Sequence, residues 1–236
     1  MTILLDRGVY FDHVRADPFG GELTQQQVDG QSFILDTFEK SRFEEWDLRW
    51  LGYALATAKH ETASTMWPIE EHGKGEGMAY GAVDPGTEQI YFGRGFVQLT
   101  WRDNYARADT ELGLGHQSSP LSCEWHADNA LRPMIAAAVM FAGMEAGWFR
   151  GAKLAEYFND DTDDPYGARN IINGDQHIVP SWSSGVSIGN IIKGYYMSFT
   201  AALNYAAEAV EEERYADDLR RIKAGERVFR DPMHHE

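Results

Sequence analysis

An ionisable residue ends the apolar stripe of a predicted helix. Asp47 is a favoured N-cap residue, and the helix after it has a core-facing stripe formed by Leu51, Ala54, Leu55 and Ala58. The next position on that stripe is Glu61. Apolar surroundings favour the protonated carboxyl, which suits a general acid. The alternative is an ordinary glutamate held in a salt bridge at the helix end.

A second carboxylate follows at Glu71 or Glu70, after a break in the chain. Ten further residues of helix would place Glu71 about 15 Å along the axis from Glu61. A pair of carboxyls that acts as acid and base on a sugar polymer needs a separation of about 6.5–9.5 Å. Pro68 breaks the helix and lets the chain bend back. The alternative is a solvated acidic pair on a loop.

Residues 91–105, with the sequence YFGRGFVQLTWRDNY, combine a Gly-Arg-Gly turn with amide, hydroxyl and aromatic groups. Such groups line grooves that bind sugar chains. A groove of this kind and two carboxylates are the features that cleavage of a glycosidic bond requires.

Several short motifs resemble the pattern of glycoside hydrolase family 19, which contains chitinases and phage endolysins. They are His60-Glu61-Thr62, Glu71-His72-Gly73, residues 91–100, Asn104-Tyr105 and residues 171–174. Residues 10–15, 23–30 and 147–149 are similar to the phage-type branch of that family. The matches run discontinuously from about residue 10 to residue 203.

The expected fold is mainly α-helical. Four or five segments have helical periodicity, and residues 96–99 form the one weak strand candidate. The resemblance adds a two-lobed, lysozyme-like shape with a central substrate cleft. Residues 1–236 are expected to form one catalytic domain.

The resemblance also implies an inverting mechanism without cofactor or metal. Glu61 would be the general acid and Glu71 the general base, with Glu70 as the alternative base and Thr100 holding the attacking water. The implied substrate-binding residues are His60, Thr62, Tyr91, Arg94, Gln98, Asn104 and Asn173.

Charge limits the partners of the chain. The net charge is −16, from 37 acidic and 21 basic residues, which argues against nucleic acid and anionic membranes. The expected partner is a polysaccharide. Peptidoglycan is the first candidate because the resemblance is to the phage-type branch. Chitin is the second, since the acidic surface suits a neutral polymer better.

No secretory signal is recognisable at the start of the sequence, where Asp6 and Arg7 interrupt a short apolar run. The single cysteine, Cys123, excludes an internal disulfide framework. We therefore expect a monomer that is made in the cytoplasm without membrane insertion. It would reach a cell wall through a holin pore, within a phage particle or after lysis.

Further elements are predicted from local signals. They are a helix from the Thr24 capping box to about Arg42, a helix from Asp103 to Glu111, a long helix that opens at Asp128 and continues past Pro133 through the apolar, buried segment 134–147, a polar loop over residues 175–189, and a helix from Asn190 onward. Trp182 in the polar loop is either part of a lid that stacks on a sugar ring or part of a surface insertion.

Four alternatives have weaker sequence support. A zinc hydrolase would use His60, but the second histidine of its motif is replaced by Ser64. A serine hydrolase would use Ser187 in Gly-Val-Ser-Ile-Gly, with a partner such as His234 or His235, but no core strand precedes it. Residues 159–164 are acidic and could bind calcium, although they lack an EF-hand pattern. The last alternative is a non-catalytic wall-binding or virion protein on the same fold.

Overall fold

The computed structural model describes residues 4–40 and 47–224, which form helices joined by long irregular segments. The α-helices are α1 (Arg7–Ala16), α2 (Gln25–Glu39), α3 (Leu48–Glu61), α4 (Arg102–Leu112), α5 (Pro133–Ala146) and α6 (Ile188–Lys223). The strands are β1 (Ile69–Glu70) and β2 (Arg94–Gly95). Short 3-10 helices are η2 (Ala79–Gly81), η3 (Ala127–Leu131), η4 (Leu154–Glu156) and η5 (Gly167–Ile171).

Two predicted helix starts are confirmed at atomic detail. The Thr24 hydroxyl accepts a hydrogen bond from the Gln27 backbone N–H, and the Gln27 side chain accepts one from the Thr24 N–H, which completes the capping box. The Asp47 carboxylate accepts from the Arg49 backbone N–H. The predicted end of the first of these helices, near Arg42, lies outside the described residues, and α2 ends at Glu39.

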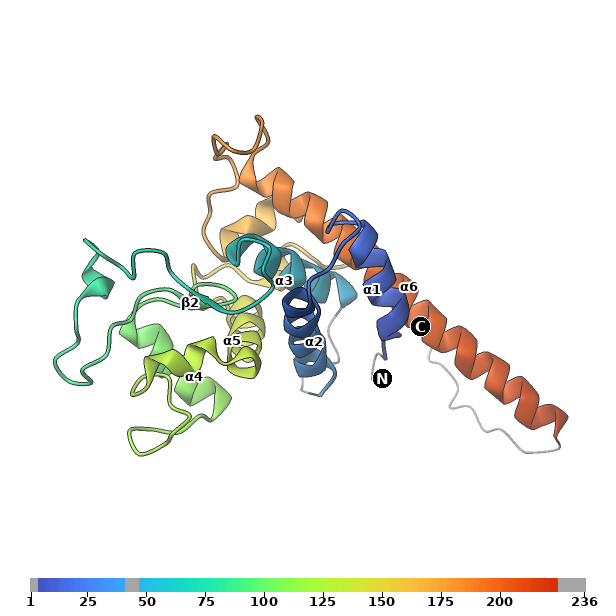
Figure 1. Ribbon diagram of the computed structural model, residues 1–236, viewed down its shortest axis with the longest axis horizontal. Helices are drawn as coiled ribbons and strands as arrows, with labels where there is room; N and C mark the ends of the chain where they lie inside the picture. Colours follow the sequence, from blue (N-terminus) through green and yellow to red (C-terminus); the bar gives the residue numbers. More distant parts are fainter. Residues whose placement is uncertain (1–3, 41–46, 225–236) are drawn as a thin grey trace.

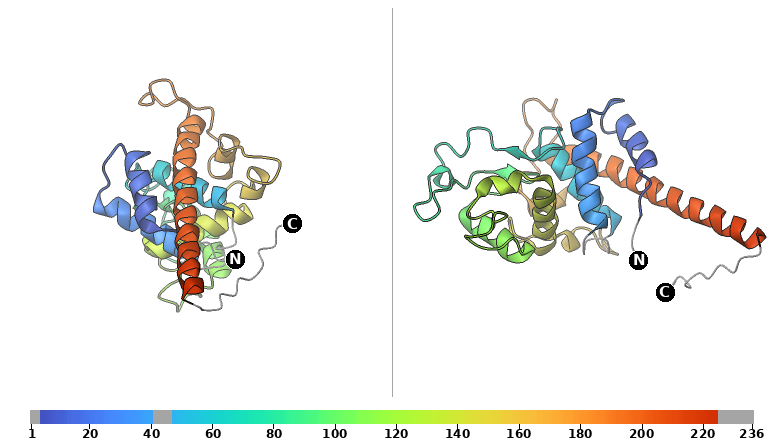
Figure 2. Two further views of the ribbon diagram at one scale, coloured as in Figure 1. Left: turned by 90° about the vertical axis from the view of Figure 1, so that its right-hand side faces the viewer. Right: turned by 60° about the horizontal axis from the view of Figure 1, so that its bottom comes forward.

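The helices pack in two groups of elements (Figures 1 and 2). In the first group, α6 packs along α1 and α3. In the second, α4 and η3 pack on α5, and η3 also packs on β2. α2 connects the two groups, because it packs on α5 of the second group and also contacts α3 of the first. The predicted fold class, a mainly α-helical two-lobed domain with at most a small sheet, is confirmed.

The small sheet lies next to the predicted position, not at it. β1 and β2 pair antiparallel, with Ile69 opposite Gly95 and Glu70 opposite Arg94. The strand predicted at residues 96–99 was wrong, since residues 96–98 form a turn that returns the chain so that Leu99 bridges Arg94. A strand needs a partner, and the partner available here is β1, which pairs with the Gly-Arg-Gly segment.

Two other helix starts differ from the prediction. α4 begins at Arg102, with Trp101 at its N-cap. Asp103 therefore lies in the first turn, where its negative charge interacts favourably with the helix dipole, and it is not the cap. Asp128 lies in the 3-10 helix η3, and the α-helix α5 starts only at Pro133. Proline has no N–H, and the first residue of a helix needs none because its N–H has no partner within the helix.

α5 is the buried helix that its apolar composition predicts. A side chain at Gly143 would place its Cβ 2.3 Å from the Phe149 ring, so this close approach needs glycine. In contrast, the second half of α6 beyond Ala206 is mostly exposed and extends away from the body (Figure 1). Among the described residues, no helix combines the length and the hydropathy that a bilayer crossing requires.

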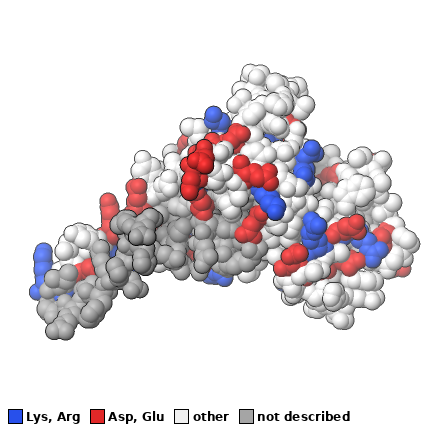
Figure 3. Space-filling model, turned by 180° about the vertical axis from the view of Figure 1, so that it is seen from behind, with Lys and Arg blue, Asp and Glu red and all other residues white. Residues whose placement is uncertain are grey.

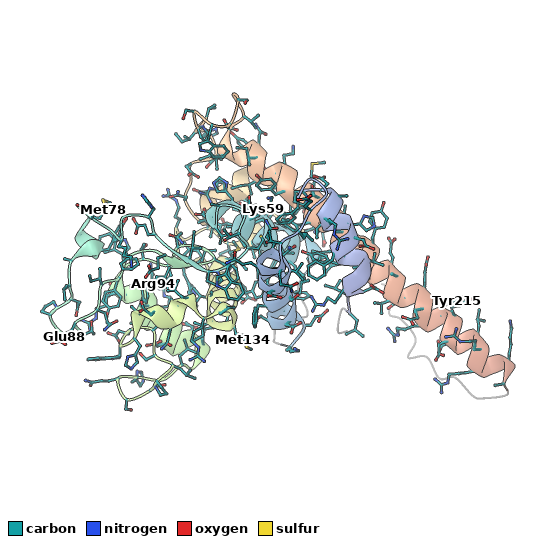
Figure 4. The ribbon with its side chains drawn as sticks, in the orientation of Figure 1. Lys59, Met78, Glu88, Arg94, Met134 and Tyr215 are labelled. Carbon is teal, nitrogen blue, oxygen red and sulfur yellow. The ribbon has the colours of Figure 1, made fainter. Side chains whose placement is uncertain are left out.

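The core also contains a lysine, Lys59, which is 5% exposed (Figure 4). Its amine donates to the Ser64 hydroxyl at 3.0 Å and lies 4.2 Å from the ring centre of Phe19 and 4.7 Å from that of Tyr195. Burial lowers the pKa of Lys59 from 10.5 to about 8, and the charge of Asp17 offsets only part of this shift.

Lys59 should make the free energy of unfolding depend on alkaline pH. Between about pH 8 and about pH 10 the unfolded chain binds a proton that the folded chain has released, so stability rises with pH over this window. We expect Lys59→Met to lose this rise, as measured by urea unfolding at the two ends of the window. The exposed Lys40→Met is the control. An equal rise in the Lys59 variant and the parent would contradict the assignment.

Candidate active site

The carboxylate of Glu61, at the last residue of α3, belongs to a charged cluster. Arg169, from η5, donates from Nη1 to Glu61 Oε1 and from Nε to Asp175 Oδ1 at 2.5 Å. The second guanidinium bond to Asp175, from Nη2 to Oδ2, is 3.2 Å long. Asn173 Nδ2 donates to the same carboxylate at 3.0 Å. We call Glu61, Arg169, Asn173 and Asp175 the Glu61 group.

The ion pairs of this group outweigh the effect of burial. Burial alone would lower the pKa of Arg169, which is 1% exposed, but the charges of Glu61 and Asp175 raise it above its usual range. Burial would likewise raise the pKa of Asp175, yet its hydrogen bonds to Arg169 lower it. Partial burial lowers the pKa of the neighbouring His60, and the charge of Glu61 offsets part of this shift.

The salt-bridge alternative for Glu61 is thereby confirmed, and the expected apolar surroundings are not found. The Glu61 side chain is 15% exposed and pairs with the Arg169 guanidinium. This contact does not exclude chemistry at Glu61, because Asp175 competes for the same cation through two hydrogen bonds.

Glu71 lies directly after β1 and is held by two hydrogen-bond donors. Its Oε2 accepts from the Gly93 backbone N–H at 2.9 Å, and its Oε1 accepts from the Tyr80 hydroxyl at 3.0 Å. Gln98 lies on the same side of Gly93, where an added Cβ would meet Gln98 Oε1 at 2.8 Å. We call Glu71, Tyr80, Gly93 and Gln98 the Glu71 group. The two hydrogen bonds fix the orientation of the Glu71 carboxylate.

Glu70 has a different partner. Its carboxylate pairs with Lys74 Nζ at 2.7 Å, and both side chains are partly exposed. Glu70 also belongs to β1, where successive side chains point to opposite faces. The structure therefore separates the two candidate bases: Glu71 is packed at the Gly-Arg-Gly turn and Glu70 pairs with an exposed lysine.

Two residues at this turn adopt a backbone conformation that side chains disfavour. Gln98 has a φ of 56° and Trp101 a φ of 69°. Trp101 is 51% exposed, and its ring meets that of Tyr80 edge-on with centroids 5.3 Å apart. Local strain of this kind often accompanies a functional site. An exposed aromatic ring is thus packed on Tyr80, the residue whose hydroxyl bonds the Glu71 carboxylate.

Three of the predicted substrate-binding residues are buried and held by contacts within the protein, and their role in substrate binding stays a prediction. Thr62, fully buried, bonds Ala58 O and the Met66 N–H and so fixes the chain after α3. Tyr91 is 3% exposed, and its hydroxyl contacts the Thr87 hydroxyl and donates to a backbone carbonyl. Arg94 is 5% exposed and stacks on the Phe92 ring at 3.6 Å.

The remaining predicted site residues differ in how close they lie to the two glutamates. Gln98 and Asn173 belong to the two groups, and His60 lies in sequence beside Glu61. Asn104 donates to the Thr100 carbonyl at 2.9 Å, so the contact between this pair uses the Thr100 backbone. The water-holding role of the Thr100 hydroxyl stays a prediction. The hydrogen bonds and ion pairs of the described residues do not join the Glu61 group to the Glu71 group.

The alternative sites gain no support from the geometry. Within residues 4–40 and 47–224, no three His, Cys, Asp or Glu side chains gather as a metal would need. Ser187 follows an irregular loop, and the strands of the described chain lie elsewhere, so a nucleophile elbow is not formed. The histidines proposed as its partners, His234 and His235, lie outside the described residues.

The sequence missed three residues of the site. No role was assigned to Arg169, Asp175 or Tyr80 from the sequence. The partners of Arg169 had no local signal, because its burial and its contact with Glu61 are set by the tertiary structure. The Tyr80 contact had no local signal, because the loop of residues 71–93 brings it to Glu71.

Comparison with known proteins supports the fold and does not assign an activity. No protein-family model matches the sequence, and no curated protein does. The structure is similar to that of chitinase C from Streptomyces griseus HUT6037, with a TM-score of 0.52 and 18% identity over 86% of this chain and 93% of that one. A mutant of chitinase C matches with a TM-score of 0.48 and 16% identity over the same shares. The chain therefore has the fold of a chitinase.

Proposed function

We propose that this protein hydrolyses β-1,4 bonds in a polymer of N-acetylated amino sugars by an inverting acid/base mechanism. The observation that carries the proposal is the contrast between two glutamates. Glu61 shares one guanidinium with Asp175, while Glu71 accepts hydrogen bonds from two uncharged donors. Paired carboxylates in unlike environments are typical of acid/base pairs.

Glu61 is the proposed acid. Arg169 bonds Glu61 through one hydrogen bond and Asp175 through two. Glu61 is therefore the less firmly held of the two carboxyls. We assign it the transfer of a proton to the leaving glycosidic oxygen as the carbon–oxygen bond breaks.

Glu71 is the proposed base. A water on the opposite face of the sugar attacks the anomeric carbon, and its proton passes to the Glu71 carboxylate as the new carbon–oxygen bond forms. The Gly93 N–H and the Tyr80 hydroxyl hold that carboxylate in one orientation. Gln98 and Asn173 supply amides for the N-acetyl groups, and the Trp101 edge supplies an apolar contact.

Glu71→Gln and Glu70→Gln form a matched pair that tests this assignment. We expect Glu71→Gln to lower kcat about 10²–10⁴-fold and Glu70→Gln to change it only a few-fold, because Glu70 pairs with Lys74. The measurement is reducing-end release from soluble chitin oligosaccharides. The opposite order of effects would make Glu70 the base.

Peptidoglycan is our first proposed substrate, on the strength of the phage-type motifs. Chitin is the second, since the chitinase fold and the net charge of −16 both favour a neutral polymer. Reducing-end release from both polymers, measured side by side, distinguishes them. A folded protein that releases ends from neither would favour a binding protein over both.

A further inference from the structure

A protruding loop between η5 and α6 presents apolar side chains to solvent. Four residues of this loop are strongly exposed: Ile178 by 57%, Val179 by 53%, Trp182 by 66% and Val186 by 43%. Figure 1 shows the loop standing out from the body at the top of the view. We call residues 176–187 the Trp182 loop. Apolar surface gathered in this way commonly marks a contact site.

The Trp182 loop is held in shape by its own hydrogen bonds. Its ends are closed by the Ile188 N–H to Ile178 O bond of 2.9 Å and the Gly189 N–H to Gln176 O bond of 3.1 Å. The Tyr166 hydroxyl lies 2.6 Å from His177 Nδ1 at the base of the loop. The tip contains two further backbone turns, over residues 180–183 and 183–186. A surface ordered before contact loses little conformational freedom on binding.

The Trp182 loop continues directly from the candidate active site. Asp175, the residue before it, holds Arg169, which bonds Glu61. A polymer chain that occupies the site can therefore extend toward the loop. Trp182 is 66% exposed and lies seven residues along the loop from Asp175, and we place it beyond the bond that is cleaved.

The charge distribution makes this loop the part of the surface that suits the first proposed substrate. The protein carries a net charge of −16, whereas residues 176–187 contain no Asp, Glu, Lys or Arg. The protrusion is correspondingly white in the face shown in Figure 3. Peptidoglycan bears carboxylates on its peptides, which an acidic surface repels. An uncharged projection can approach its glycan strands without that repulsion.

We propose that the Trp182 loop is an anchoring surface for insoluble peptidoglycan, with the Trp182 ring lying on the apolar face of sugar rings outside the site of cleavage. This inference rests on the proposed function, because the occupant is the proposed substrate. The three exposed aliphatic residues widen the contact around the ring.

The test measures binding and cleavage separately. Co-sedimentation with purified insoluble peptidoglycan uses Glu61→Gln protein, so that the polymer stays intact. Adding Trp182→Ala should lower the affinity about tenfold, as loss of a central aromatic contact does. Adding Trp182→Phe should restore most of it. Met134→Ala, which removes an equally exposed side chain at 61%, is the control and should bind like the parent.

Cleavage by otherwise unaltered protein adds a second measurement. Trp182→Ala should reduce activity on insoluble polymer about tenfold more than activity on soluble oligosaccharides. Equal losses on both would overturn the anchor and make the loop part of the catalytic site. Undiminished sedimentation of the variant would also overturn it, as would loop-dependent binding to anionic lipid vesicles but not to peptidoglycan.

The two proposals fail in different ways. If the parent cleaves nothing but sediments with peptidoglycan through Trp182, the hydrolase proposal fails and the anchor stands. If the parent cleaves oligosaccharides but sedimentation is independent of Trp182, the anchor fails and the hydrolase proposal stands.

Discussion

Glu61→Gln is expected to lower kcat on soluble chitin oligosaccharides by about 10²–10⁴-fold, with a much smaller change in KM. The glutamine amide oxygen can still accept the Arg169 hydrogen bond, so the cluster keeps its shape. The amide has no proton to give to the leaving oxygen. The loss therefore falls on the chemical step.

The control for this variant is Glu156→Gln, at an exposed glutamate in η4, which should retain parental turnover. Thermal unfolding of both variants checks that the fold is kept. A Glu61→Gln protein that turns over at the parental rate would rule out the assignment of Glu61 as the acid.

Arg169→Met is expected to destabilise the protein by about 3–5 kcal/mol, the usual result of breaking a buried ion pair from one side. The substitution leaves Glu61 and Asp175 facing each other without their common cation, with side chains only 15% and 23% exposed. For a chain of this size, the loss corresponds to a fall in Tm of roughly 6–20 °C.

The effect of Arg169 should also depend on pH. Asp175 has a lowered pKa in the folded protein, so its contribution to stability is complete above about pH 4 and is lost as pH falls through the lowered value. The difference between parent and Arg169→Met in urea unfolding should therefore be largest near neutral pH and shrink in acid.

Two further variants provide an intermediate case and a control for the loss of stability in Arg169→Met. Arg169→Lys keeps the charge but loses the planar fork that reaches both carboxylates, so an intermediate loss is expected. Arg214→Met removes an exposed partner of Glu211, 58% exposed on α6, and should leave Tm unchanged. Equal Tm values for the Arg169 and Arg214 variants would show that the cluster does not stabilise the fold.

Local signals in the sequence were sufficient for several helix starts. The Thr24 capping box and the Asp47 N-cap each depend on residues two or three positions away, so a short window contains the whole interaction. The buried character of α5 was equally predictable, because it has small or apolar residues on nearly every side.

Elements that need a distant partner were predicted less well. The strand at the Gly-Arg-Gly turn was misplaced by two residues or more, because its position is fixed by pairing with β1, which lies about 25 residues earlier. The N-cap of α4 was assigned to Asp103, whereas the turn conformation of Trp101 decides where that helix begins.

The sequence by itself determined that this chain would be mainly helical, where several of its helices would begin, and that Glu61 would end a core-facing stripe. Those properties follow from periodicity and capping, which act over a few residues. Only the tertiary structure decided that Arg169, which lies 108 residues from Glu61, joins Glu61 to Asp175, and that Glu71 rather than Glu70 is held at Gly93. These contacts depend on where remote segments meet when the apolar faces of the helices are buried, and no short window of sequence contains that information.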